Sequence, residues 1–141
     1  MGRPAVITFT VPGIPQPKGS KKIVGKSKTT GRPIMINDAA GLKAWAKAVE
    51  TSAMVERVRN GGTLLGPVRV RVVFHMPRPA EPTFDVPAVK PDIDKLLRAV
   101  FDGITKGRLW EDDARVVWCL AEKVYGDPGV TVTLQKAIPG S

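Results

Sequence analysis

Four short stretches rich in β-branched and aromatic residues predict β-strands. They span residues 6–11, 68–76, 116–125 and 130–135. Alternation is clearest in 68–76, where every even position is apolar and arginine or histidine occupies three of the odd positions. The last two stretches flank Gly126-Asp127-Pro128-Gly129, a sequence typical of a tight turn, and this predicts that they form a hairpin.

Two further stretches have apolar residues at helical spacing and predict helices. The first runs from Asp38, a suitable N-cap, to about Asn60, and Gly61-Gly62 ends it. The second begins at Asp92 and ends close to Gly107; its apolar positions are Ile93, Leu96, Leu97, Val100, Phe101 and Ile104. The order of elements predicts one α+β domain over residues 1–141, with a small mixed sheet of about four strands and both helices packed on it.

Two long segments are predicted to be loops. Residues 12–37 are rich in glycine, proline, serine and lysine and form a basic loop, whereas residues 77–91 hold five prolines. Long loops in a compact domain are usually functional or mobile.

The composition narrows the classes of function. A formal charge of +9, with 22 basic against 13 acidic residues, favours a polyanionic partner. Cys119 and His75 are the sole cysteine and histidine, which excludes internal disulfides and metal sites built from clusters of either residue. We expect Cys119 to be a buried, inert thiol and the three tryptophans to pack. The sequence lacks a membrane span or signal-peptide pattern, so we expect a cytoplasmic protein with no membrane partner.

The charge is unevenly distributed. Residues 1–37 contain seven basic residues and no acidic one, whereas residues 81–113 hold eight of the 13 acidic residues. Carboxylates repel DNA phosphates unless a cation lies between them. This contrast suggests that the acidic residues have a function different from that of the basic residues.

The acidic residues recur around the second predicted helix. Asp94, Arg98 and Asp102 share its polar face, Asp92 stands at its start, and Asp112-Asp113 directly precede the next strand, where the sheet could present them to the same pocket. Hard cations such as Mg²⁺ prefer a few carboxylates and keep their other positions for water and phosphate. Each acidic residue also has an ordinary explanation as a helix cap, a loop residue or an ion-pair partner, so a metal site and structural carboxylates both remain open.

One part of the chain resembles a known family. The run Lys90-Pro91-Asp92-Ile93-Asp94-Lys95-Leu96-Leu97-Arg98-Ala99-Val100-Phe101-Asp102-Gly103-Ile104, continued by Trp110-Glu111-Asp112-Asp113-Ala114-Arg115-Val116-Val117, is similar to the signature of the RusA-type Holliday junction resolvases. These are small endodeoxyribonucleases common in bacteriophages. A weaker likeness, to the Pro-x-Pro-Lys loop of many phage members, lies in Gly13-Ile14-Pro15-Gln16-Pro17-Lys18-Gly19.

The resemblance implies a homodimer that cuts four-way DNA junctions during recombination or repair. It implies that Asp92, Asp94 and Asp113 are catalytic and bind Mg²⁺, for which Mn²⁺ could substitute. Arg98 stands where the family often has a functional lysine, and its planar guanidinium suits charge stabilisation better than proton transfer.

Other basic residues suit contacts with the DNA backbone. We expect such contacts from Lys18, Lys21, Lys22, Arg69 and Arg71. The alternative is a non-catalytic basic DNA- or RNA-binding protein whose carboxylates are structural.

Overall fold

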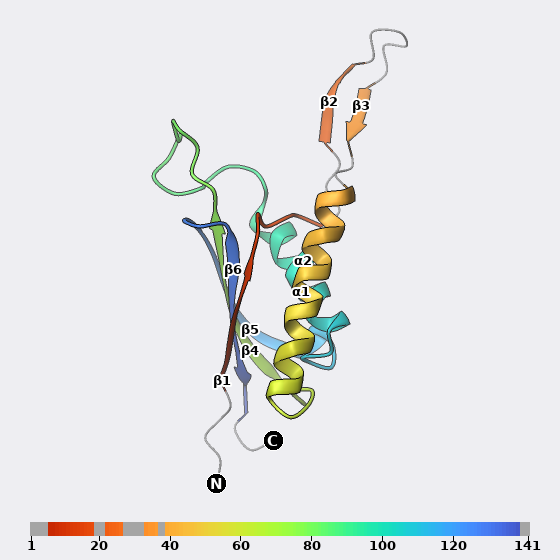
Figure 1. The fold of residues 1–141 in the computed structure, drawn as a ribbon. Coiled ribbons are helices and arrows are strands. Elements are labelled where there is room, and N and C mark those ends of the chain that lie inside the picture. Colours follow the sequence, from red (N-terminus) through yellow and green to blue (C-terminus); the bar gives the residue numbers. More distant parts are fainter. Residues whose placement is uncertain (1–5, 19–21, 27–32, 37–38, 139–141) are drawn as a thin grey trace.

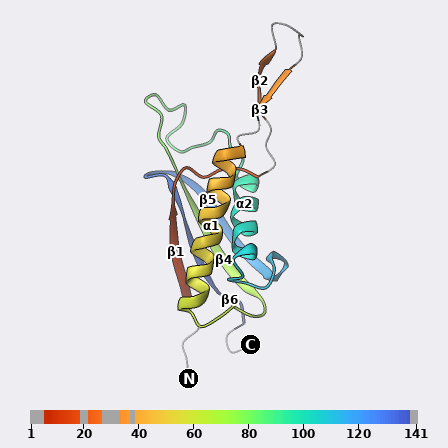
Figure 2. The same cartoon turned by 45° about the vertical axis from the view of Figure 1, so that its right-hand side comes forward.

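Two helices cover one face of a four-stranded sheet, and a separate two-stranded hairpin projects beyond them (Figures 1 and 2). The computed structural model describes residues 6–18, 22–26, 33–36 and 39–138. The elements in chain order are β1 (Val6–Pro12), β2 (Lys22–Lys26), β3 (Pro33–Ile36), α1 (Ala39–Arg59), β4 (Val68–Met76), α2 (Ile93–Lys106), the 3₁₀ turn η1 (Asp113–Arg115), β5 (Val116–Tyr125) and β6 (Gly129–Lys136). The predicted α+β class, the four strands and both helices are confirmed.

The strand order in the sheet is β1-β6-β4-β5. β6 is antiparallel to both β1 and β4, whereas β5 runs parallel to β4, with Val72 opposite Ala121. The predicted hairpin of the last two strands is therefore wrong, because β4 lies between them. β4 carries a continuous apolar row on its helix-facing side, and a position between two strands buries that row and satisfies both backbone edges.

The basic segment 12–37 is not entirely a loop. It contains the antiparallel pair β2 and β3, in which Lys22 lies opposite Ile36 and a bulge interrupts the register between Ile23 and Gly25. The apolar run Ile34-Met35-Ile36 falls in β3. The predicted cap Asp38 lies outside the described residues. Residues 77–91 form no helix or strand, as predicted.

The core lies between the sheet and the two helices. It contains the even positions of β4 together with Trp45, Val49 and Ala53 of α1 and Leu96, Val100 and Ile104 of α2. Ile93, although part of the predicted apolar stripe, is exposed in the first turn of α2. No helix in the described part of the chain is long and apolar enough to cross a membrane.

The first half of β5 is an exposed edge of the sheet. Val117 is 65% exposed, and Trp118 and Leu120 are each 41% exposed. Cys119 is exposed as well, so its predicted burial is wrong, although partial desolvation still raises the pKa of its thiol. These residues are exposed because β5 has a strand neighbour on one side alone among the described residues, and its residues 117–120 are not covered by the core.

The two helices approach closely at Gly103 of α2 and at Gly107, which directly follows this helix. A Cβ added at Gly103 would lie 2.5 Å from Val49 Cγ1, and one added at Gly107 would lie 2.7 Å from the Glu50 carbonyl oxygen. Both distances are shorter than non-bonded atoms tolerate, so this contact requires glycine and places α2 against α1.

We expect Gly103→Ala to lower the free energy of unfolding by about 1–3 kcal/mol, because the added methyl group overpacks the contact with Val49. This loss would appear despite the better helix propensity of alanine. Gly126→Ala is the control, since its Cβ would lie at an ordinary 3.6 Å from His75. Urea denaturation of both variants measures the difference, and equal stability would contradict the tight contact.

Candidate active site

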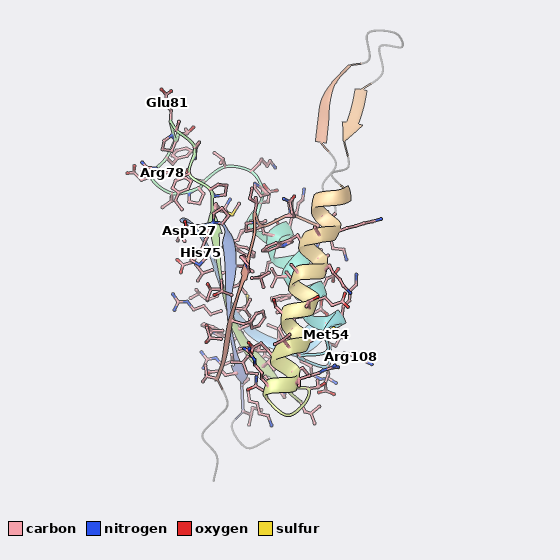
Figure 3. All side chains as sticks on the ribbon, in the orientation of Figure 1. Met54, His75, Arg78, Glu81, Arg108 and Asp127 are labelled. Atoms are coloured by element: carbon pink, nitrogen blue, oxygen red, sulfur yellow. The ribbon has the colours of Figure 1, made fainter. Side chains whose placement is uncertain are left out.

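Helix α2 has a pair of acidic residues at each end. Asp92 and Asp94 lie at its N-terminus, and Asp112 and Asp113 follow its C-terminus and lead into β5. A helix of 14 residues is about 21 Å long, so a single chain keeps the two pairs apart. In Figure 3, Arg108 lies just after the C-terminus of α2, and Arg78 and Glu81 lie on the proline-rich loop toward the opposite end of the molecule.

The predicted shared pocket does not form within one chain. Among the described residues, no group of three or more histidine, cysteine, aspartate or glutamate side chains lies close enough to hold a metal ion. The reason is topological: β5 is parallel to β4 and begins beside the start of that strand, where Val68 lies opposite Val116. Asp113 therefore lies at the end of the sheet where β4 begins. Asp92 follows loop 77–91, which leaves the sheet at the opposite end, where β4 ends.

At the N-terminal end of α2, the Asp92 carboxylate does not bind the backbone N–H groups that an N-cap side chain usually binds. Asp92 occupies the N-cap position, but its side chain makes no capping hydrogen bond. It instead pairs with the Lys90 ammonium at 3.0 Å, and this hydrogen-bonded cation lowers the pKa of Asp92. The peptide bond between Lys90 and Pro91 is cis. This end of the helix thus presents an ionised oxygen ligand.

Asp94 and Arg98 are both exposed on the polar face of α2. Although one helical turn apart, they form no ion pair with each other among the described side chains. A mutual ion pair therefore does not explain these two residues. Asp102, further along the same face, pairs with Lys18.

At the other end, Asp112 and Asp113 interact directly. A hydrogen bond between their carboxyl groups lowers the pKa of Asp112 and raises the pKa of Asp113, because the second carboxyl retains the proton that the first accepts. Both side chains are exposed. A cation that bound here could replace that proton and relieve the repulsion between two carboxylates.

The chain before this acidic pair is firmly anchored. Trp110 is fully buried, its Nε1 donates to Thr105 Oγ1 at 2.7 Å, and its ring packs edge-on against Phe101. The carboxylate of Glu111 accepts hydrogen bonds from the Gly66 backbone N–H at 2.8 Å and from Arg115 Nε at 3.2 Å. The contacts of Trp110 and Glu111 fix the position of the chain from which Asp112 and Asp113 project. The predicted packing of Trp110 is confirmed.

Each end of α2 suits a hard divalent cation in its donor chemistry. Each offers two exposed carboxylates and no histidine or thiolate, which matches Mg²⁺, an ion that often binds through one or two carboxylates and retains its waters. In one chain the N-terminal end of α2 carries Asp92 and Asp94 and the other end carries Asp113, so neither end holds all three residues.

The predicted DNA-contacting residues do not form one surface. Lys18 lies beside α2, where its backbone N–H donates to the Lys95 carbonyl. Arg69 and Arg71 lie on the sheet face opposite the helices, where Arg69 stacks over the Trp118 ring at 4.5 Å and Arg71 pairs with Glu122. Trp118 is thus a partly exposed partner of Arg69 and not a core residue. Lys21 and the side chain of Lys22 lie outside the described residues.

Two lysines near Asp92 were not predicted from the sequence. Lys90 is two residues before Asp92, and this proximity is a signal that the sequence carries. Lys123 lies on β5 and reaches the chain just before Asp92 through tertiary structure alone, so no local pattern indicates it.

Comparison with known proteins agrees with the earlier resemblance. The family model described as endodeoxyribonuclease RusA matches residues 12–135. The match covers both ends of α2 and the strands of the sheet, except β1, of which it includes Pro12 alone, and the last residue of β6. A comparison with curated proteins gave no match. Because the family match extends over most of the chain, the protein belongs to the RusA family of endodeoxyribonucleases, the Holliday junction resolvases.

Proposed function

We propose that the protein resolves four-way DNA junctions as a homodimer that depends on a divalent metal ion. The observation that carries this proposal is the pair of exposed carboxylates at each end of α2 in a chain of net charge +9. Membership of the RusA family supports the DNA substrate and the hydrolytic reaction.

Asp92, Asp94 and Asp113 are the residues that would hold Mg²⁺, or Mn²⁺ in its place. When bound, such an ion activates water and neutralises charge on a phosphodiester, so that cleavage leaves a 5′-phosphate and a 3′-hydroxyl. Arg98, one turn after Asp94, would direct its guanidinium to the phosphate and stabilise the charge that develops there. The Lys90 ammonium would have to give up Asp92 to the metal and would then be free for a DNA phosphate.

A homodimer would join the two halves of the site. A twofold axis that passes beside α2 near its middle, perpendicular to the helix, would place two copies of α2 antiparallel, so that Asp92 and Asp94 of one copy would lie near the partner's Asp113. The same axis generates a second, identical site. Two sites related in this way suit a four-way junction, in which two strands of the same polarity are nicked.

The exposed half of β5 is the surface best suited to the contact between copies. Val117, Trp118 and Leu120 are exposed apolar side chains that follow Asp113 by four to seven residues, and the outer backbone edge of β5 has no strand partner among the described residues. Exposed apolar side chains on an unpaired strand edge favour association with another protein surface. Contact here would bring Asp113 close to the partner.

Asp94→Asn is expected to abolish Mg²⁺-dependent nicking of a synthetic four-way junction. Removal of a residue that supports a metal ligand typically lowers activity by about 10–100-fold, and the loss of nicking activity in Asp94→Asn should be larger. Binding of the junction in chelator should persist, because the variant removes a negative charge. The measurement is a gel assay with labelled junction and matched linear duplex, with Mg²⁺ and with chelator.

Two results of that assay would contradict the proposal. Tight junction binding without nicks by the wild type in Mg²⁺ or Mn²⁺ would indicate a non-catalytic DNA-binding protein. Equal nicking by the wild type and the Asp94→Asn variant would exclude Asp94 from the site.

A mixed dimer tests whether two chains share each site. In a heterodimer of Asp94→Asn with Asp113→Asn chains, one site receives both substitutions and the other receives neither. We therefore expect each variant homodimer to be inactive and the heterodimer, purified through two different tags, to nick one strand of the junction. Its rate should approach half that of the wild type.

The matched control is a heterodimer of Asp94→Asn with Asp92→Asn chains. Both substitutions then fall in the same half of the site, so each of the two sites carries one, and no activity should return. An inactive Asp94→Asn/Asp113→Asn heterodimer would show instead that each site is built within one chain.

A further inference from the structure

The chain that leads into α2 makes few hydrogen bonds of its own. Within the proline-rich segment 77–91, the described backbone hydrogen bonds include a single local one, from the Ala88 N–H to the Val86 carbonyl at 2.7 Å. The prolines supply no N–H donors. Carbonyl groups of this segment therefore need donors from elsewhere if the segment is to hold one position.

Lys123 supplies such donors at the residues next to Asp92. Its ammonium donates to the Val89 carbonyl at 2.8 Å and to the Pro91 carbonyl at 3.0 Å. These two carbonyls belong to the residues on either side of Lys90, and Pro91 directly precedes Asp92. An ammonium has three donors on a compact group, which allows it to bind two carbonyls at once.

The sheet fixes the base of the Lys123 side chain. Lys123 lies in β5 opposite Phe74, a fully buried residue of β4, so its Cβ points to the helix side of the sheet. Its side chain is half-buried and spans from the sheet to the loop. A rigid strand is thus tied to a segment that lacks regular structure.

Lys123 differs in its contacts from the other cation at this end. Lys90 binds the Asp92 carboxylate directly and has an 80% exposed side chain, so it competes with a metal for the same oxygens. Lys123 binds main-chain oxygens and leaves both carboxylate oxygens available. Its charge also contributes, after those of Lys90 and Lys95, to the lowered pKa of Asp92.

We propose that Lys123 is a positioning residue, which ties the main chain at Val89 and Pro91 to the sheet and so sets the place of Asp92. This inference rests on the proposed function for the role of Asp92, but the contact it describes exists independently of metal. Residues that orient metal ligands in this way typically contribute about 10–100-fold to metal affinity or activity.

The test compares Lys123→Met with Lys43→Met, which removes the same charge from an exposed site on α1. Hydrogen exchange in the metal-free protein is followed by mass spectrometry over a peptide that spans residues 84–92. We expect the Ala88 amide, which makes the described backbone hydrogen bond of this segment, to exchange at least about fivefold faster in Lys123→Met, because two hydrogen bonds that restrain the chain around it are lost. Peptides from α1 and β4 should be unchanged, and Lys123→Arg, which keeps the charge and the donors, should restore most of the protection.

Binding of Mg²⁺ alone, measured by titration calorimetry, gives a separate result. We expect about 10-fold weaker binding by Lys123→Met and unchanged binding by Lys43→Met. If the wild type binds no Mg²⁺, the proposed metal dependence fails, and the exchange result still decides the role of Lys123.

Two results would overturn the positioning role. One is equal exchange over residues 84–92 in Lys123→Met and the wild type. The other is faster exchange throughout the sheet, which would make Lys123 a general stability residue. If Lys123→Met does not fold, Lys123→Gln and Lys123→Arg are compared by the same measurement, and equal protection in both would overturn the proposal.

Discussion

The packing of α2 against both α1 and the sheet is the constraint on which the site depends. Leu96, Val100 and Ile104 bury one side of the helix completely, and Gly103 lets α1 approach that side closely. With this side committed to the core, the opposite side and both ends remain open to solvent. The rise of 1.5 Å per residue then sets how far apart the two acidic pairs stand. The geometry of the site therefore follows from a helix that the core holds straight and in one orientation.

Local patterns in the sequence were sufficient for the four strands of the sheet and the two helices, but they missed β2 and β3 and did not determine which strands are neighbours. The alternation in 68–76 and the helical spacing after Asp92 correspond closely to β4 and α2, because burial on one side imposes those periods. The turn after Tyr125 was correctly located, but a turn does not determine which strand lies beside the next. The exposure of Cys119 and Trp118 was not predicted for the same reason, because it depends on the position of β5 at the edge of the sheet.

The acidic residues illustrate a similar limit. The sequence indicated Asp92, Asp94 and Asp113 as a group, and the family match supports the region in which they lie. Their separation follows from the direction of β5, which is set by its pairing with β4 and is not encoded near Asp113. The link between α2 and β5 adds to this separation, because Trp110 is hydrogen-bonded to Thr105 and keeps the chain before Asp113 near the C-terminal end of the helix.

The ion pairs around α2 are exposed and therefore exchangeable. Lys90 with Asp92 and Lys18 with Asp102 both lie in contact with water, where ion pairs contribute little to stability. Lysines in such pairs can be released to phosphates at little cost, whereas the buried anchor at Trp110 stays in place. The site thus combines a rigid scaffold with charges that are easily redirected.

The position of β6 inside the sheet determines when the sheet can form during synthesis. Within the described residues β1 pairs with β6 and no other strand, and the residues that the two strands bring together, such as Thr8 and Thr133, are separated by almost the whole chain. During synthesis β1 therefore has no strand partner, and one edge of β4 remains open, until β6 has left the ribosome. Non-local pairings of this kind slow folding and leave strand edges exposed to aggregation in the meantime. The sheet closes in a late step in which β6 is inserted between two strands made long before it.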